Sequence, residues 1–371
     1  MKKNSILLLA LAIIIIAFSS CNSQLSKTDV KGIQYGMIRQ IDHLGDTWIG
    51  TWADDGHIYS VADDCSTSDS TASNLALFRM KGDDPLNLEL ELINPMSEYG
   101  AICQLDADSL AWKASGITCI DGILYMFVSR HDYPWRNHKL VDNRQTACDG
   151  SIIKSIDHGK TWTRTAEENT RNPMFPGRRF ASGFFIEYGK DGKAGPDDSD
   201  KYVYAVANDG FWNNGSDIVL GRCFRSKLPD LNKNDWEFYK GDGKKGNNEN
   251  WSQELTSAVP VLTDSTHIGM STVTYLPHVN KYILAQWYFP TGGFCGRTSI
   301  WSFREADAPW GTWETFSRDT FAAEGFYNPG ILTKFVKDDG FSSYITVAGD
   351  CFNQEKYYKL HLVPFRLLSE K

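Results

Sequence analysis

The sequence predicts an all-β protein that folds as a five-bladed β-propeller. Short runs rich in Val, Ile, Tyr, Phe and Trp recur along the chain, and clusters of Gly, Asp, Asn and Pro separate most of them, as is typical of strands and turns. Aromatic strand-like segments recur about every 65–75 residues, at 57–63, 123–129, 202–208, 282–288 and 344–350. Five such repeats, each with further strands, fit blades that bury their faces against their neighbours. A β-sandwich with a similar number of strands is the alternative.

The first element, residues 1–21, resembles a bacterial lipoprotein signal peptide. Two lysines precede an apolar run at 6–18, which is too short and wrongly flanked for a membrane-spanning helix. The segment ends in "AFSSC", so we expect Cys21 to carry the lipid and residues 22–33 to form a polar tether. An ordinary secretory signal is the alternative. Asn22 resembles a signal for sorting to the outer membrane, so we expect an outer-membrane lipoprotein that faces the periplasm or the cell surface.

Residues 34–371 are expected to form a single propeller domain. Aromatic residues make up 13% of the chain, which suits both β-sheets and surfaces that stack on sugars. The net charge is −8 and basic residues do not cluster, which argues against a nucleic-acid partner. We expect a monomer that binds a polysaccharide or oligosaccharide and touches the membrane only through its anchor. The cysteines show no CxxC spacing, which argues against a zinc site but leaves room for one or two disulfides.

The segment "SIDHGKTW" at 155–162 fits the pattern S-x-D-x-G-x-T-W. This pattern is the Asp box of sialidase-like propellers, in which Asp and Gly form a tight turn between outer strands and Trp packs between blades. We therefore expect structural roles for Asp157 and Trp162.

The stretch "GDTWIGTWADDGHIYSVADD" at 45–64 contains five aspartates and reads as a β-hairpin. A three-residue loop ending in Gly56 fits a type I turn followed by a left-handed glycine, so Asp54 and Asp55 are expected to shape the turn. This register places Asp46 opposite Asp64. A two-residue loop would instead place Asp46 opposite position 65, with the aspartate at 63 as its diagonal neighbour.

Either register brings Asp46 together with Asp63 and Asp64 at the open end of the hairpin. Carboxylates that face each other across two strands destabilise a sheet, so their presence suggests a chemical role. The pair Asp46 and Asp64 could supply the acid and base of glycoside hydrolysis. The structural alternative is a set of strand-end aspartates that bond to loop amides.

The same hairpin, with "ANDGFWNNGSDIVLGR", "GMSTVTYLPHVNKYILAQW", "APWGTWETF" and "FYNPG", resembles the domain of unknown function 4185. That group overlaps glycoside hydrolase family 183, the endo-D-arabinanases, and the likeness runs over most of residues 40–365. It implies a five-bladed propeller that hydrolyses α-D-arabinofuranosyl linkages. It also implies paired catalytic aspartates in the first blade, here Asp46 and Asp64. Related five-bladed folds serve arabinofuranosidases, fructosidases and glycan phosphorylases.

Further candidates lie outside the catalytic pair. Glu254, beside Trp251 in "WSQELTSAV", could act as a proton donor if it is buried; a solvent-facing glutamate is the alternative. The loop "YGKDGKAGPDDSDKY" could hold a structural calcium ion through Asp191, Asp197 and Asp200, although it matches no fixed ligand spacing. We expect no other metal or cofactor. The candidates for substrate binding are Trp48, Asp63, Arg179, Asn208, Asp209, Trp212, Tyr327 and Asn328.

Two other functions remain open. A non-catalytic glycan-binding propeller would use the same aromatic funnel but would not need an intact acid/base pair. Arg130, His131, Arg178 and Arg179 could bind an anionic glycan, which would favour a sialidase-like exo-glycosidase. Sialidases use a converging arginine triad with a Tyr–Glu pair. The position of these arginines therefore distinguishes a sialidase-like exo-glycosidase from an endo-arabinanase-like hydrolase.

Overall fold

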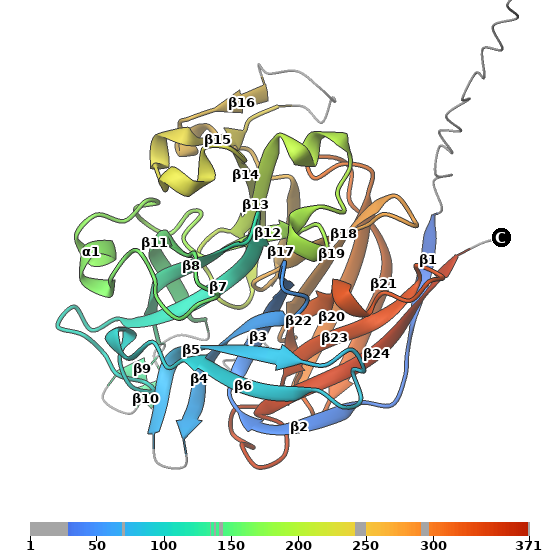
Figure 1. Cartoon of the computed structure of the whole chain (residues 1–371), viewed down its shortest axis with the longest axis horizontal. Helices are drawn as coiled ribbons and strands as arrows, with labels where there is room; N and C mark the ends of the chain where they lie inside the picture. The colour runs from blue at the N-terminus through green and yellow to red at the C-terminus, as the bar shows by residue number, and fades with distance from the viewer. Residues whose placement is uncertain are drawn as a thin grey trace, which may run out of the picture.

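The computed structural model describes residues 29–68, 71–133, 135–136, 139–140, 144–241, 250–290 and 297–369. Its strands group into five blades around a common axis (Figure 1), and neighbouring strands within each blade pair antiparallel. One strand of the third blade, Gly183–Glu187, also pairs parallel with one of the fourth, Thr272–Leu276. The predicted all-β propeller is therefore confirmed, and the arrangement of its strands is consistent with the predicted five blades. The expected signal peptide, including Cys21, lies outside the described residues.

The blades follow one another along the chain. Blade 1 consists of β3–β6, at Asp46–Trp52, Ile58–Ser68, Thr71–Lys81 and Glu89–Asn94. Blade 2 consists of β7, β8 and β11, at Ala111–Ile120, Ile123–Asp132 and Thr146–Ser155. Blade 3 consists of β12–β16, at Gly183–Glu187, Tyr202–Asn208, Gly215–Phe224, Trp236–Tyr239 and Trp251–Ser252, and β17 (Leu262–Ile268) pairs with its β14. Blade 4 consists of β18–β21, at Thr272–Leu276, Lys281–Tyr288, Thr298–Ala306 and Glu314–Ala322, and blade 5 contains β22–β24, at Tyr327–Leu332, Ser342–Ala348 and Lys359–Ser369.

The N-terminal strands close the ring. β1 (Val30–Tyr35) and β2 (Arg39–Leu44) both pair antiparallel with β24, the last strand of the chain. The innermost strands contact one another in the order β3, β7, β12, β18 and β22, and β22 contacts β3 again. Because β1 starts at Val30, the propeller begins inside the segment predicted as a tether. Val30 is buried and its amide donates to Glu305, which fixes this strand to blade 4.

Short elements connect the blades. The α-helix α1 (Ala166–Arg171) begins with a capping box formed by Thr165 and Glu168. The remaining elements are the short strands β9 (Trp135–Arg136) and β10 (Lys139–Leu140) and the 3-10 turns η1 (Ser97–Tyr99), η2 (Lys190–Gly192), η3 (Asp197–Asp200), η4 (Leu228–Asp230), η5 (Lys233–Asp235), η7 (Leu255–Ser257) and η8 (Thr333–Phe335). None of the helices in the described part of the chain has the length and apolar character needed to span a bilayer.

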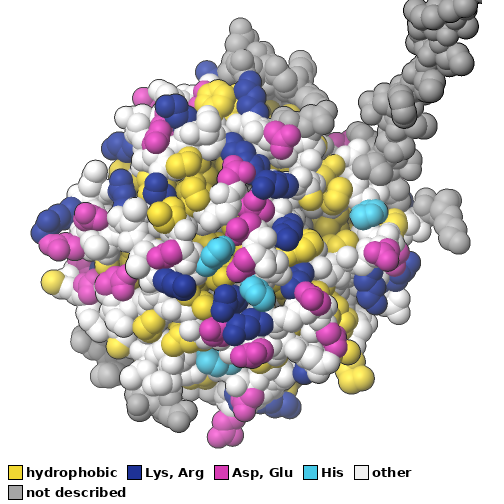
Figure 2. Space-filling view, in the orientation of Figure 1, with side chains coloured by type: hydrophobic (Ala, Val, Ile, Leu, Met, Phe, Trp, Pro, Cys, Tyr) yellow, Lys and Arg dark blue, Asp and Glu magenta, His cyan; other side chains and the backbone are white. Residues whose placement is uncertain are grey.

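Aromatic side chains fill much of the space between the blades. Phe127, Phe175, Phe180 and Trp236 form one buried cluster between blades 2 and 3, with ring centroids 5.0–6.4 Å apart. Many of the aromatic residues therefore serve packing rather than sugar binding. On the face shown in Figure 2, acidic and basic side chains are interspersed without an extended basic patch.

The Asp box forms the expected turn after β11. Asp157 accepts hydrogen bonds from the amide and hydroxyl of Thr161 at 2.9 and 2.7 Å. Gly159 has a φ of 88°, and a Cβ at this position would lie 1.9 Å from the Leu77 side chain. Trp162 packs against the core. The motif therefore joins blade 2 to blade 1, in the structural role expected for it.

The first hairpin has the predicted three-residue turn. The Ala53 amide donates to the carbonyl of His57 at 2.9 Å, and Gly56 has a φ of 86°. Regular pairing extends outward from Trp52–Ile58 to Ile49–Val61, as the three-residue loop requires.

The register shifts by one residue before Asp46. Asp46 lies opposite Asp63, so the predicted pairing of Asp46 with Asp64 is wrong. Thr47 and Trp48 have φ values of 63° and 48° and form a β-bulge, in which two residues of one strand face one residue of its partner. The bulge leaves all three aspartates at the open end of the hairpin but changes which of them face each other.

Candidate active site

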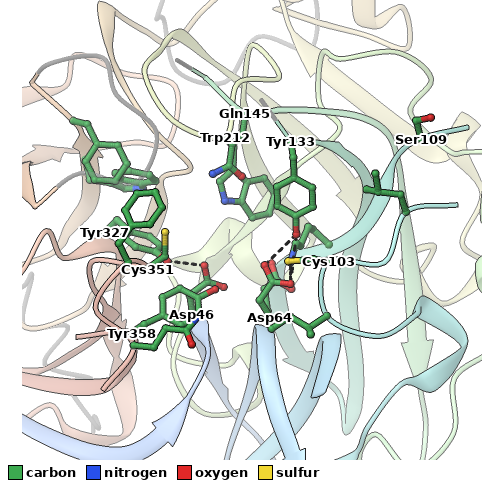
Figure 3. Close-up of a pocket in the computed structure, with 18 residues that line it drawn as sticks. Asp46, Asp64, Cys103, Ser109, Tyr133, Gln145, Trp212, Tyr327, Cys351 and Tyr358 are labelled. Carbon is green, nitrogen blue, oxygen red and sulfur yellow. Dashed lines mark hydrogen bonds and ion pairs between the residues drawn. The ribbon is translucent and has the colours of Figure 1, made fainter. Parts of the chain in front are cut away.

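A cavity of about 590 Å³ lies at the end of the propeller where β3, β7 and β22 begin and where β8 and β19 end. Figure 3 shows its lining. The lining residues are Asp46, Asp63, Asp64, Ile102, Cys103, Leu105, Ser109, Lys113, Tyr133, Gln145, Trp212, Trp287, Phe289, Tyr327, Cys351, Phe352, Gln354 and Tyr358. The predicted pair, Asp46 and Asp64, thus shares one cavity with side chains from all five blades or their connections.

Asp46 lies half-buried beside two tyrosines of blade 5. The Tyr327 hydroxyl donates a hydrogen bond to Asp46 Oδ2 at 2.6 Å, and Tyr358 also bonds to this carboxyl. Burial raises the pKa of Asp46 to about 7, and the negative charge of Asp64 adds to this effect, whereas Lys113 and the two tyrosines oppose it. Asp46 can therefore hold a proton near neutral pH, as a general acid must.

Asp64, in contrast, lies beside a positively charged side chain. The ammonium of Lys113 lies 2.6 Å from Asp64 Oδ1, and the Tyr133 hydroxyl donates to Asp64 Oδ2 at 3.1 Å. Burial lowers the pKa of Lys113, but Asp64, Tyr133 and Asp63 outweigh burial and raise it well above its usual range. Lys113 therefore stays charged and stabilises the ionised form of Asp64. Figure 3 shows Asp46 and Asp64 on opposite sides of the cavity, each next to its tyrosine.

Asp63 is a third carboxyl at the floor of the cavity. It is almost fully buried, and its Oδ1 accepts a hydrogen bond from the Ala114 amide at 3.1 Å. Burial, together with the charges of Asp46 and Asp64, raises its pKa well above the usual range. Asp63 ties β4 to β7 and so positions its neighbour Asp64, and it also lines the cavity.

The walls of the cavity are largely aromatic. Trp287 lies 5.3 Å from Tyr327 between ring centroids, and Trp212 meets the edge of the buried His131 ring at 4.8 Å. Burial and the charge of Lys113 lower the pKa of His131 well below its usual range, so it supports Trp212 as a neutral ring. Flat aromatic faces above a polar floor suit the apolar faces and hydroxyl groups of sugars. Trp212 and Tyr327, two of the candidates for substrate binding, line this cavity.

Two predicted substrate contacts lie in the core instead. Trp48 is fully buried, donates to the Gly45 carbonyl at 2.9 Å and packs against His43 and Phe78. The left-handed backbone of the bulge turns its side chain away from the cavity. Asn328 is also fully buried, with a φ of 54°, and does not line the cavity.

Other candidates bond to nearby loops. Asn208 Oδ1 and Asp209 Oδ2 accept hydrogen bonds from the amides of Gly210 and Ser216, both at 3.1 Å. Arg179 donates to the Ala258 carbonyl at 2.7 Å. Glu254 is exposed and precedes η7 at the edge of blade 3. None of the four lines this cavity. The polar oxygens of Asn208 and Asp209 instead satisfy backbone amides of nearby turns.

The arginines do not converge as a sialidase-like site requires. Arg130 forms ion pairs with Asp106 and Asp108 at 2.9 and 2.7 Å, and Arg178 lies over the Phe211 ring. Among the described residues that line the cavity there is no arginine. The described part of the lining therefore offers no guanidinium group that would hold an anionic sugar through bidentate contacts.

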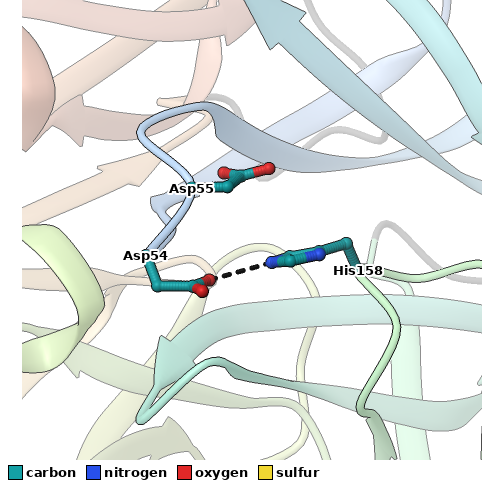
Figure 4. Close-up of side chains that lie close together, drawn as sticks. All are labelled: Asp54, Asp55 and His158. Carbon is teal, nitrogen blue, oxygen red and sulfur yellow. Dashed lines mark hydrogen bonds and ion pairs between the residues drawn. The ribbon is translucent and has the colours of Figure 1, made fainter.

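Groups that could hold a metal ion lie at the opposite end of the hairpin. The Asp54 carboxylate bonds to His158 Nε2 at 2.9 Å, next to Asp55 (Figure 4), and Asp54 also lies near Cys119 and Asp191. Asp55 accepts from the His57 amide at 3.0 Å, as expected of a turn residue. In the loop predicted for calcium, Asp191 pairs with Lys193 and accepts from the Gly122 amide, Asp200 is exposed, and the Asp197 side chain lies outside the described residues.

Several polar residues of the cavity were not predicted from the sequence, among them Lys113, Tyr133, Gln145 and Tyr358. Lys113 left a signal, because it is the one charged residue in the buried run "AWKASGITCI", and a lysine in such a run needs a carboxylate partner. The two tyrosines and the glutamine stand in polar or aromatic loops that resemble many others in this chain. Of the cysteines, Cys103 is a thiol in the cavity lining and Cys351 is disulfide-bonded.

Comparison with known proteins finds similarity in fold. No protein-family model and no curated protein matches the chain. A Bacteroides ovatus crystal structure described as a hydrolase matches with a TM-score of 0.51 and 13% identity, over 88% of this chain and 87% of that one. The RS223 β-xylosidase matches with a TM-score of 0.48 and 11% identity over 90% and 96% of the two chains. A family-43 endo-arabinanase from Bacillus licheniformis matches with a TM-score of 0.44 and 11% identity over 87% and 95%. The first of these matches, with a TM-score above 0.5, supports a shared fold.

Proposed function

We propose that the protein is a glycoside hydrolase in which Asp46 is the general acid and Asp64 the general base or nucleophile. One observation carries this proposal: a single cavity holds a buried carboxyl group with a raised pKa and a second carboxyl group that is paired with a lysine. Asp46 has a pKa of about 7, whereas Asp64 forms an ion pair with a buried lysine. Two acids whose surroundings separate their ionisation are the arrangement that glycoside hydrolysis needs.

The chemistry follows from the contacts of each group. Asp46 would donate its proton to the glycosidic oxygen, and Tyr327 would stabilise the carboxylate that remains. Asp64 would act on the other side of the sugar, either by activating water or by attacking the anomeric carbon. Lys113 and Tyr133 hold the Asp64 carboxylate in position. Asp63 fixes β4, the strand that carries Asp64, to β7.

The cavity favours a neutral glycan. Its lysine is already paired with Asp64 and its described lining contains no arginine, so no unpaired cation is there to hold a uronate or sialic acid, whereas aromatic walls suit neutral sugar rings. The resemblance to the endo-D-arabinanases narrows the proposal to cleavage within chains of α-D-arabinofuranosyl units. We further propose that the protein acts at the outer membrane, anchored through Cys21.

The test is hydrolysis of a panel of polysaccharides, including mycobacterial-type arabinan, with products separated by size. Asp46→Asn and Asp64→Asn remove a proton-transfer group at nearly constant shape and should each reduce turnover about 10²–10⁴-fold. Asp55→Asn is the matched control, because asparagine also suits that turn position. Melting curves should show that all three variants are folded.

Two results would contradict the assignment. If Asp55→Asn is inactive while the other two variants hydrolyse normally, the wrong aspartates have been chosen. If the parent binds glycans but hydrolyses none, the protein is a binding propeller, the second candidate function.

A further inference from the structure

A second cavity, of about 620 Å³, lies at the other end of blade 4. It is formed where β18 ends and β19 begins, and by the connection from β20 to β21. Strand β19 separates the two cavities, because Lys281 lines the second cavity and Trp287 lines the catalytic one. The strand rises about 20 Å between these positions. One small ligand therefore cannot occupy both cavities.

The second cavity has an aromatic wall in a fixed position. Trp310 is partly exposed and lies in a turn closed by a hydrogen bond from the Gly311 amide to the Ala308 carbonyl. Its ring lies 6.4 Å from Tyr239, with an angle of 20° between the planes, and 6.4 Å from Trp251 at 89°. Contacts with blade 3 thus hold the ring, so ligand binding would not have to pay for ordering it.

The polar lining carries an excess of negative charge. Lys281 lies 3.2 Å from Asp29, 3.4 Å from Glu305 and 3.2 Å from Asp307. Glu314 and the amide of Asn280 add further polar groups. Carboxylates outnumber the single ammonium, so phosphate, sulfate and uronate groups would be repelled. Carboxylate and amide oxygens can instead accept hydrogen bonds from sugar hydroxyls.

We propose that this cavity is a second, non-catalytic binding site for a neutral glycan chain. The choice of ligand rests on the proposed function, whereas the cavity and its charge do not. A polysaccharide long enough to reach both ends of the propeller would be held at two sites, which raises its effective concentration at the catalytic cavity. Short oligosaccharides would gain nothing from the second site.

The test uses the full chain carrying Asp64→Asn, so that binding is measured without hydrolysis. Retention is measured by electrophoresis through gels that contain either D-arabinan or xylan. Thr312→Arg places a long side chain at the exposed edge of the cavity, and Trp310→Ala removes the aromatic wall. Thr320→Arg is the matched control, because Thr320 is exposed in the same blade but does not line the cavity.

We expect Thr312→Arg and Trp310→Ala to weaken retention at least about fivefold, the size expected for the loss of one aromatic contact. Thr320→Arg should migrate like the Asp64→Asn parent. With Asp64 restored, Thr312→Arg should cleave short oligosaccharides at the parental kcat/KM. If Thr312→Arg is folded and is retained as well as Thr320→Arg, the second site is disproved even if the protein is a hydrolase. If retention falls but no glycan is hydrolysed, the second site stands and the proposed catalytic function fails.

Discussion

Replacing Lys113 with methionine tests how the cavity separates the two acids. The substitution keeps most of the volume of the side chain and removes a buried positive charge that lies 2.6 Å from Asp64. A pair of charges about 4 Å apart interacts by about 4 kcal/mol at an effective dielectric constant near 20. One pH unit corresponds to about 1.4 kcal/mol, so removing the charge can shift the pH profile of activity by at most about three units. Water that enters the site will screen part of this, and we expect a shift of at least about one unit.

The sign of the shift follows from the charge. Lys113 stabilises negative charge on both carboxyl groups, and its effect on Asp46 is to lower the pKa. Without the lysine, Asp46 keeps its proton to higher pH. The alkaline limb of the profile of kcat/KM against pH, which reports the proposed acid, should therefore move to higher pH.

Stability and activity need separate measurements for this variant. Removing one partner of a buried ion pair costs about 3–5 kcal/mol, which denaturant unfolding at pH 7 would measure. Lys281→Met is the matched control, because Lys281 is also buried among carboxylates but lies away from the catalytic cavity. The control should lose stability and keep the parental pH profile. Lys113→Arg keeps the charge and should keep both limbs near their parental positions. A folded Lys113→Met variant with an unchanged pH profile would refute the reasoning.

Three further predictions concern other parts of the chain. Tyr327→Phe removes the hydrogen bond that stabilises ionised Asp46, so the alkaline limb should move to higher pH while the acidic limb stays; equal shifts of both limbs would contradict this role. Burial raises the pKa of Glu187 to about 8, so its neutral form is favoured in the folded state and stability should fall as the pH rises from about 4.5 towards 8, by up to about 1.4 kcal/mol per pH unit. Glu187→Gln should remove that slope in denaturant unfolding at several pH values, and an unchanged slope would assign it to other groups. Cys21→Ala should move the protein from the membrane fraction to the soluble fraction, and unchanged partitioning would place the anchor elsewhere.

The fold could be predicted because its signals are local and repeated. Aromatic strands, turn residues and the Asp box each report on one hairpin, and a repeat of hairpins with this period indicates blades. The closure of the ring could not be predicted from such local signals. Val30–Tyr35 pairs with the far end of the chain. Its start lies in the polar segment predicted as a tether, and only the folded structure brings Glu305 next to the Val30 amide.

The candidate site was predicted in part for the same reason. Asp46, Asp63 and Asp64 belong to one hairpin, so turn chemistry alone brings them together. The bulge at Thr47 and Trp48 escaped prediction because neither residue is a usual choice for a left-handed backbone. It is held by tertiary packing of the Trp48 ring, which no local pattern reports. The lysine and tyrosines that complete the cavity come from other blades.

The two acids therefore depend on different interfaces of the ring. The tyrosines beside Asp46 belong to blade 5, which is built from both ends of the chain, whereas Lys113 and Tyr133 beside Asp64 belong to blade 2. A change that loosens the pairing of β2 with β24, which begins at Lys359 beside Tyr358, would admit water near Asp46 and weaken the burial that raises its pKa. The same change leaves the ion pair of Asp64 in place. Ring closure thus contributes to the acid more than to the base, which links the last strand pairing of the fold to the protonation state of the cavity.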